Sequence, residues 1–132
     1  MASLNRVQLI GRLGRDPEAR FTPTGKKVVH FSLAVSTHWK SREGETNEST
    51  EWVNIEAWER VAEVCQEFLK KGSLVYLEGR LKIDKYEENG ETRFFTKVVA
   101  SVVEFLDRKP VDEPMFTDQE EEREEQALEF EF

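Results

Sequence analysis

A single stretch of helical periodicity interrupts an otherwise strand-like chain, and this feature constrains the fold most. Within residues 60–71, apolar side chains recur at the i, i+3, i+4, i+7 spacing of one helix face: Val61, Val64, Cys65 and Phe68. Lys70 and Lys71 fall in the last predicted turn, and Gly72 follows as a stop signal. No good N-cap residue precedes this segment. The pattern therefore predicts one helix, over residues 60–71.

Alternating apolar and polar side chains predict strands on both sides of this helix. The predicted strands span residues 4–13, 28–36, 51–58, 74–86 and 92–106. Residues 40–50 contain no apolar side chain, so they are predicted to form a long exposed hairpin loop. The order strand, strand, strand, helix, strand, strand is typical of an all-β domain, a five-stranded OB-fold barrel with one helix between strands 3 and 4.

Charge divides the chain into two parts. Residues 110–132 carry ten acids and one base, a net charge of −9, whereas the whole chain carries −8, so residues 1–109 carry +1. We therefore predict a folded domain over residues 1–109 and a disordered acidic C-terminal tail over residues 110–132. The near-neutral body is compatible with nucleic-acid binding despite the acidic pI of the whole chain.

The tail ends in acids, aromatic rings and a predicted free carboxylate, a combination that favours a protein-docking peptide. The predicted partner-docking residues are Glu129, Phe130, Glu131 and Phe132. A purely solubilising acidic end is the alternative. Residues 118–129 are also rich in residues that favour a short helix.

Several classes of function find no support in the residues. Cys65 is the only cysteine, which excludes an intrachain disulfide and a cysteine cluster for zinc. His30 and His38 lack a Cys or a paired acid at motif spacing, and the chain has no Gly-rich phosphate loop or nucleophile motif. We predict no enzyme activity, metal, cofactor or small-molecule substrate. The sequence shows no signal peptide and no run long enough for a membrane span, so we expect a cytoplasmic protein without a membrane partner.

Four aromatic rings fall on the solvent side of two predicted strands. Trp52 and Trp58 share a face with Asn54 and Glu56, opposite the apolar face of residues 51–58. Tyr76 and Tyr86 share parity with charged side chains in residues 74–86. Such rings either pack under a loop, meet a partner chain or stack on nucleic-acid bases. Trp39 has the parity of the core residues before it, unless a bulge turns it outward.

Several ordered motifs resemble the bacterial single-stranded DNA-binding (SSB) family over roughly residues 1–106. They are Leu4-Asn-Arg-Val-Gln-Leu-Ile-Gly-Arg-Leu-Gly-Arg-Asp-Pro-Glu-Ala-Arg-Phe21, Thr50-Glu-Trp52, Ala62-Glu63, Leu69-Lys-Lys-Gly-Ser73 and Val75-Tyr-Leu-Glu-Gly-Arg-Leu81. The resemblance implies a homotetrameric OB-fold that binds single-stranded DNA without sequence preference. It further implies that the protein protects DNA during replication, recombination and repair, in association with the nucleoid.

The resemblance also implies roles for individual residues. The family's stacking aromatics fall on Trp39, Trp52 and Trp58, the last commonly Phe, and on Tyr86, commonly Trp; Trp39 is thereby placed outward. Phosphate-contacting bases fall on Lys40, Arg60, Lys71, Lys85 and Arg93.

The tail departs from the family pattern, which is a long Gly/Pro/Gln-rich linker and a tip ending Asp-Asp-Asp-Ile-Pro-Phe. Here the linker is short and charged and the tip reads Ala127-Leu-Glu-Phe-Glu-Phe132. The terminal Phe and the charge still imply docking of replication and repair proteins. Two other functions stay open: a protein-interaction module whose rings are buried in a subunit interface, and an RNA binder.

Overall fold

The computed structural model describes residues 2–107. The predicted tail over 110–132, its possible helix over 118–129 and its docking residues lie outside this range. The elements are β1 Val7–Leu13, β2 Glu18–Phe21, β3 Lys27–Lys40, β4 Thr46–Trp58, α1 Glu59–Phe68, β5 Leu74–Glu88 and β6 Glu91–Phe105. Within residues 2–107, no helix is long and apolar enough to cross a membrane.

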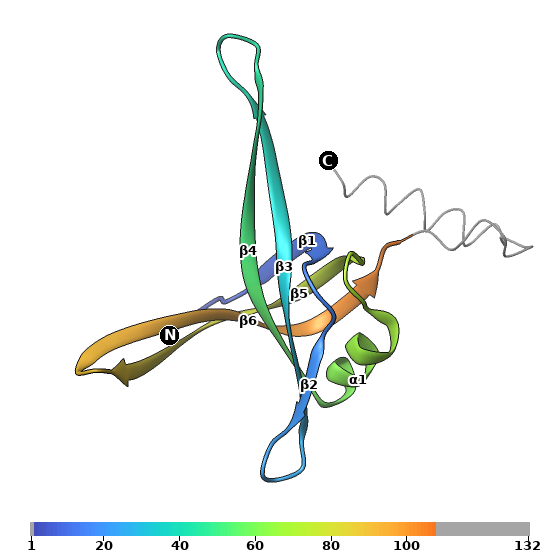
Figure 1. The fold of residues 1–132 in the computed structure, drawn as a ribbon, viewed down its shortest axis with the longest axis vertical. Helices are drawn as coiled ribbons and strands as arrows, with labels where there is room; N and C mark the ends of the chain where they lie inside the picture. Colours follow the sequence, from blue (N-terminus) through green and yellow to red (C-terminus); the bar gives the residue numbers. More distant parts are fainter. Residues whose placement is uncertain (1, 108–132) are drawn as a thin grey trace, which may run out of the picture.

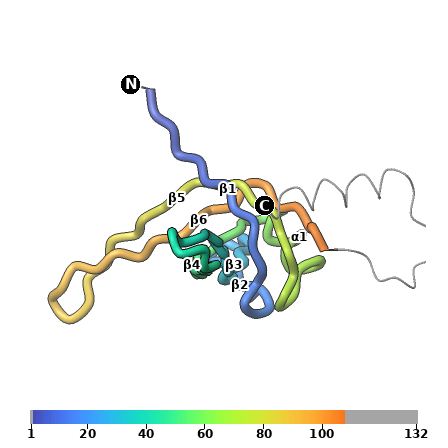
Figure 2. Tube along the Cα trace, turned by 90° about the horizontal axis from the view of Figure 1, so that it is seen from above, coloured from blue at the N-terminus to red at the C-terminus, as the bar shows by residue number. Residues whose placement is uncertain are grey.

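Five strands close into a barrel. β1 pairs antiparallel with β5 and with β3, β3 pairs with β4, β5 pairs with β6, and β4 runs parallel to β6. This ring confirms the predicted five-stranded OB-fold barrel with one helix between its third and fourth long strands. The short β2 was not predicted; it pairs with β3 at the edge of the ring. The β3–β4 and β5–β6 hairpins extend beyond the barrel as two arms that point in different directions (Figures 1 and 2).

The barrel closes where β1 meets β3, at the pairs Arg12↔Ala34 and Leu13↔Leu33. A side chain on Gly11 would collide with the main-chain carbonyl of Ala34, so glycine is required for this close approach. Side chains of alternating parity then fill the interior. The fully buried members of the core include Val29, Leu33, Ile55, Val75 and Leu77.

The helix differs from the prediction at its C-terminal end and in its buried face. α1 ends at Phe68 because Leu69 is already extended, so Lys70 and Lys71 lie in the following turn, where Gly72 has a φ of 88°. Ala62 and Cys65 are buried, whereas Phe68 of the predicted apolar stripe is 58% exposed. The barrel covers a narrow strip of the helix that is centred on small side chains. As predicted, the helix has no side-chain N-cap: Trp58 stands there without a capping hydrogen bond.

The prediction of a loop over residues 40–50 is wrong. β3 continues to Lys40 and β4 begins at Thr46, which leaves only a tight turn that the Ser41 N–H closes by donating to the Glu45 carbonyl at 2.9 Å. This part of the arm projects beyond the core, so both of its faces meet water. Polar cross-strand contacts, such as the 3.2 Å hydrogen bond between the Ser36 and Thr50 hydroxyls, replace the apolar alternation that marks a half-buried strand.

Candidate nucleic-acid interface

The outer face of β4 carries two of the predicted rings. Cross-strand pairing sets Trp58 opposite Val28 and Trp52 opposite Ala34, on the face away from the core. Trp52 is 62% exposed and Trp58 is 37% exposed. Both rings therefore lie where the alternation of residues 51–58 predicts them.

Trp52 packs against the turn that follows β1. A Cβ atom on Gly14 would collide with the six-membered ring of Trp52, so the absence of a side chain there makes room for the indole. The Gly14 N–H donates to the Ser32 carbonyl at 3.0 Å, which ties this turn to β3. The turn thus supports one part of the ring, and the larger part stays open to solvent.

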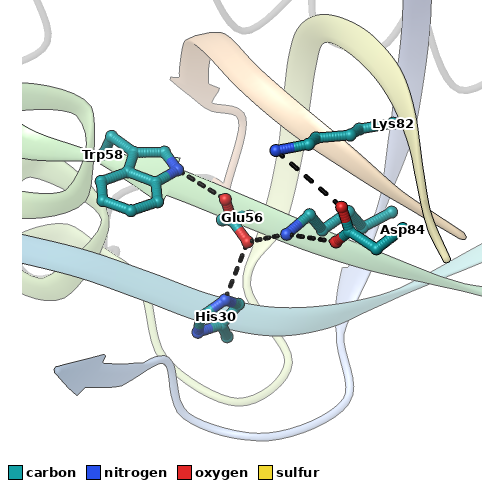
Figure 3. A network of polar contacts seen from close by, with 6 residues as sticks. His30, Glu56, Trp58, Lys82 and Asp84 are labelled. Carbon is teal, nitrogen blue, oxygen red and sulfur yellow. Dashed lines mark hydrogen bonds and ion pairs between the residues drawn. The ribbon is translucent and has the colours of Figure 1, made fainter. Parts of the chain in front are cut away.

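Trp58 is anchored by a buried carboxylate. Its indole Nε1 donates to Glu56 Oε1 at 2.5 Å, while Glu56 Oε2 receives Lys97 Nζ at 2.6 Å and lies 3.1 Å from His30 Nε2 (Figure 3). Glu56 was predicted on a solvent-facing side of the strand, yet it is only 3% exposed. Lys97 also lies 2.9 Å from Asp84, so the network joins the barrel part of β4 to the β5–β6 hairpin.

The network shifts the pKa values of its charged members. Burial alone raises the pKa of Glu56, but hydrogen bonds from Lys97, Trp58 and His30 outweigh it, so this pKa lies below its ordinary value. Burial lowers the pKa of Lys97, but its bonds to Glu56 and Asp84 prevail and raise it. Both groups are therefore charged at neutral pH.

The β5–β6 arm carries Tyr86, Arg93 and Lys85. Tyr86 lies opposite Arg93 and both share one face of the arm; Arg93 is 3.5 Å from carboxylate oxygens of Glu88 and Glu91. Lys85 lies opposite Phe94 in the adjacent pair, so it shares the other face. The structure thus brings Tyr86 and Arg93 together and separates Lys85 from them.

Trp39 keeps the parity of the core residues. The β3–β4 pairing runs in continuous register from Val28↔Trp58 to Lys40↔Thr46, so Trp39 lies on the opposite face of the hairpin from Trp52. The ring is nevertheless 49% exposed, because the arm extends beyond the core at this point. Exposure arises here from the length of the hairpin and not from a bulge.

The remaining predicted cations lie apart from one another. Lys40 is exposed at the outer end of β3, and Arg60 is exposed two residues after Trp58, in the first turn of α1. Lys71 lies in the turn after α1, where its backbone N–H donates to Asp16 Oδ1 at 2.8 Å. No contact joins these three side chains to the rings within the described residues.

A pocket of about 350 Å³ lies beside β2, the barrel part of β3 and β4, and β6, and it is lined in part by residues that sequence reasoning did not single out. Phe95 and Lys97 of β6 are among them. The turn at Asn89-Gly90 fixes the pairs Tyr86↔Arg93 and Asp84↔Phe95, so the parity of the hairpin could have identified Phe95. For residues 2–107, no group of His, Cys, Asp or Glu could hold a metal ion.

The fold and this surface define a class, the OB-fold barrels with exposed rings on extended hairpins. The single-strand binding protein family model matches residues 4–106. The chain is 49% identical over 105 residues to the single-stranded DNA-binding protein of Neisseria meningitidis serogroup B, covering 79% of this chain and 60% of that protein. It is 44% identical over 108 residues to single-stranded DNA-binding protein 1 of Chlorobaculum tepidum, covering 80% and 67%.

Two solved structures are similar to this fold, each 32% identical in sequence. The Plasmodium falciparum SSB in complex with single-stranded DNA has a TM-score of 0.75 and covers 81% of this chain and 98% of that one. A deletion mutant of the Thermus aquaticus single-stranded DNA binding protein has a TM-score of 0.71, with 79% and 51% covered. The chain belongs to the single-strand binding protein family. It spans about 60% of the length of the Neisseria relatives.

The Glu56 network predicts an acid-sensitive contribution to stability. Because the folded-state pKa of Glu56 is lowered, its contribution is present above the ordinary value of 4.5 and is lost as pH falls through the folded pKa. We expect Glu56→Gln to lower the free energy of unfolding by about 1–3 kcal/mol at pH 7, because charge-assisted hydrogen bonds weaken. Urea unfolding at pH 7 and on acidification to about pH 3 measures this, and the two curves should converge toward the acid end.

The matched control is Glu48→Gln on the same strand, where an exposed carboxylate lies 3.6 Å from His38. It should change stability by less than about 0.5 kcal/mol. A constant difference between wild type and Glu56→Gln at every pH would contradict the assignment.

Proposed function

We propose that this chain binds single-stranded DNA without sequence preference, by stacking bases on Trp39, Trp52, Trp58 and Tyr86. The observation that carries the proposal is the pair Trp52 and Trp58, two large rings open to solvent on one outer face of a barrel strand. Membership of the single-strand binding family supports it, as does the likeness to a structure in complex with single-stranded DNA. Every base has a π-face, so stacking tolerates any sequence.

Preorganisation adds to the binding energy at Trp58. The Glu56 carboxylate already holds the indole N–H in the free protein, so little side-chain entropy is lost when a base stacks on the ring. At Trp52, the absence of a side chain on Gly14 makes room for one side of the indole ring. Both rings thus meet the strand in defined orientations.

Phosphate contacts are proposed for Lys40, Arg60, Lys71, Lys85 and Arg93. Within residues 2–107 all of these side chains except Arg93 are free of ion pairs, so binding a phosphate breaks no salt bridge in the protein. Arg93 must instead exchange its two loose carboxylate contacts. Release of condensed counterions should make the affinity fall as salt rises.

Removing one ring should reduce the binding free energy by the contribution of one stacked base. Trp52→Ala and Trp58→Ala should each weaken oligo-dT binding by about 1–3 kcal/mol. Quenching of Trp fluorescence during titration with oligo-dT, at two salt concentrations, measures both the affinity and its salt dependence.

Phe68→Ala is the matched control, since this ring is 58% exposed but lies on α1, outside the proposed surface. Its affinity should equal that of the wild type. Absence of quenching in the wild type would favour the rival in which the rings serve a protein interface. Equal affinity for oligo-U would show that the 2′-OH is not discriminated.

The wider role that we propose is protection of single-stranded DNA during replication, recombination and repair, in the cytoplasm at the nucleoid. The single-strand binding family is a DNA-binding family without catalysis, in line with the prediction that the chain is not an enzyme. The proposed binding chemistry supports this role, because a strand that is stacked and held by its phosphates is unavailable for pairing.

A homotetramer is the assembly that we propose. Leu81, Ile83 and Phe94 share the core-side face of the β5–β6 arm and are 42%, 57% and 65% exposed, an apolar surface that a second copy can bury. Sedimentation equilibrium of the full chain should give four times the 15.4 kDa chain mass. A mass of one chain at micromolar concentration would contradict this proposal.

Docking of replication and repair proteins is proposed for the tail residues Glu129, Phe130, Glu131 and Phe132, which lie outside the described residues. Their support is the sequence alone: two Phe side chains among acids. Removing residues 110–132 should abolish binding of such proteins, measured by calorimetry, and leave oligo-dT binding at high salt intact. Unchanged partner binding would leave the tail with a solubilising role.

A further inference from the structure

A pocket opens at the middle of the outer face of β4, between Trp52 and Trp58. A DNA strand that stacks on both rings would cross this position. Along this face the side chains follow in the order Trp52, Asn54, Glu56 and Trp58, so Asn54 and Glu56 occupy the two positions between the rings. The pocket of about 350 Å³ is lined by Asn54 and, on the neighbouring β3, by His30 and Ser32. A pocket of this size lies within the range of small-ligand sites.

An aromatic ring borders this pocket from the β5–β6 arm. Phe95 is 44% exposed and lies opposite Asp84, on the same face of the β5–β6 arm as Tyr86 and Arg93. Phe94, its neighbour, has the opposite parity and shares the core-side face. Phe95 therefore continues the proposed stacking surface from Tyr86 toward the pocket, whereas Phe94 does not.

The cations around the pocket differ in how far they are neutralised. Lys97 Nζ lies 2.6 Å from Glu56 and 2.9 Å from Asp84, and its side chain is only 13% exposed, so two carboxylates already compensate its charge. Arg20 has one loose contact, 3.9 Å from Glu18.

Arg15 is a lining residue with no ion pair to any residue in the range 2–107, and it is exposed. Arg15 is therefore the cation that is most available to a phosphate, and Arg20 is the next.

The pocket also offers polar groups to a base edge. The Ser32 hydroxyl and the Asn54 amide line it, and neither side chain has a hydrogen-bond partner among the described residues. The amide provides both donors and an acceptor, and the hydroxyl provides one of each kind, so together they can adapt to any of the four bases.

We propose that this pocket seats one nucleotide of the bound strand, with its base stacked on Phe95, its edge toward Ser32 and Asn54, and its phosphate at Arg15 and Arg20. The proposal rests on the proposed single-stranded DNA binding and adds a fifth stacking ring, on the β5–β6 arm. Lys97 holds Glu56 in place and does not contact the phosphate.

The test compares Phe95→Leu with Phe68→Leu in the full chain, titrated with oligo-dT at several salt concentrations. Phe95→Leu should weaken binding by at least about fivefold, the lower end for one stacked base, with an unchanged salt slope. Phe68→Leu keeps an apolar side chain on α1, outside the proposed DNA-binding and tetramer surfaces, and should bind like the wild type. Thermal unfolding of both variants verifies that each is folded.

Arg15→Gln tests the phosphate contact independently of the ring. It should reduce the slope of log K against log salt by about 0.7, the value for one contact on a single strand. An unchanged slope, or equal losses in Phe95→Leu and Phe68→Leu, would overturn the proposal. If Phe95→Leu and Arg15→Gln bind normally while Trp52→Ala binds weakly, the pocket fails and the proposed function stands. If the wild type does not bind oligo-dT, the proposed function itself fails.

Discussion

Closure of the barrel between β1 and β3 is the constraint on which the rest of the structure depends. It rests on the pairs Arg12↔Ala34 and Leu13↔Leu33 and on a glycine, Gly11, that lets the two backbones approach. Because the ring is closed, the long strands have paired edges where they form the core, and their extra length can leave the barrel as arms. The arms need no core of their own, so their side chains are available for contacts with a ligand.

The surface chemistry follows from the two-residue repeat of those strands. One parity fills the barrel and the other parity faces outward, which sets Trp52 and Trp58 on one outer face. The parallel register of β4 and β6 then brings Lys97 within 2.6 Å of Glu56, although 41 residues separate them along the chain. One ion pair thus joins two hairpins that are far apart in the sequence, and the same carboxylate accepts the hydrogen bond from Trp58.

The sequence predicted the barrel, the single helix and the face of Trp52 and Trp58, because each depends on local periodicity and burial. It failed for residues 46–50, since a strand with water on both faces has no apolar alternation to detect. The sequence also predicted Glu56 on a solvent-facing side, whereas it is buried and paired with Lys97 of β6. A contact between residues so far apart in the sequence leaves no local pattern. The exposure of Trp39 follows from the length of the hairpin, a quantity that periodicity alone did not provide.

A body with a net charge of only +1 over residues 1–109 can still bind a polyanion, because its charges are not equally available. Carboxylates in the described residues compensate Arg6 and Lys97, at 2.9 Å and 2.6 Å respectively, and these bases contribute to the fold. Arg15, Lys40 and Arg60 have no such partner there. A DNA phosphate interacts with the Lys and Arg side chains that have no carboxylate partner, and the positions of these side chains relative to the rings matter as well. The net charge describes neither property. A stacking surface of this kind therefore works with a few free cations, where a groove for duplex DNA would need a dense basic stripe.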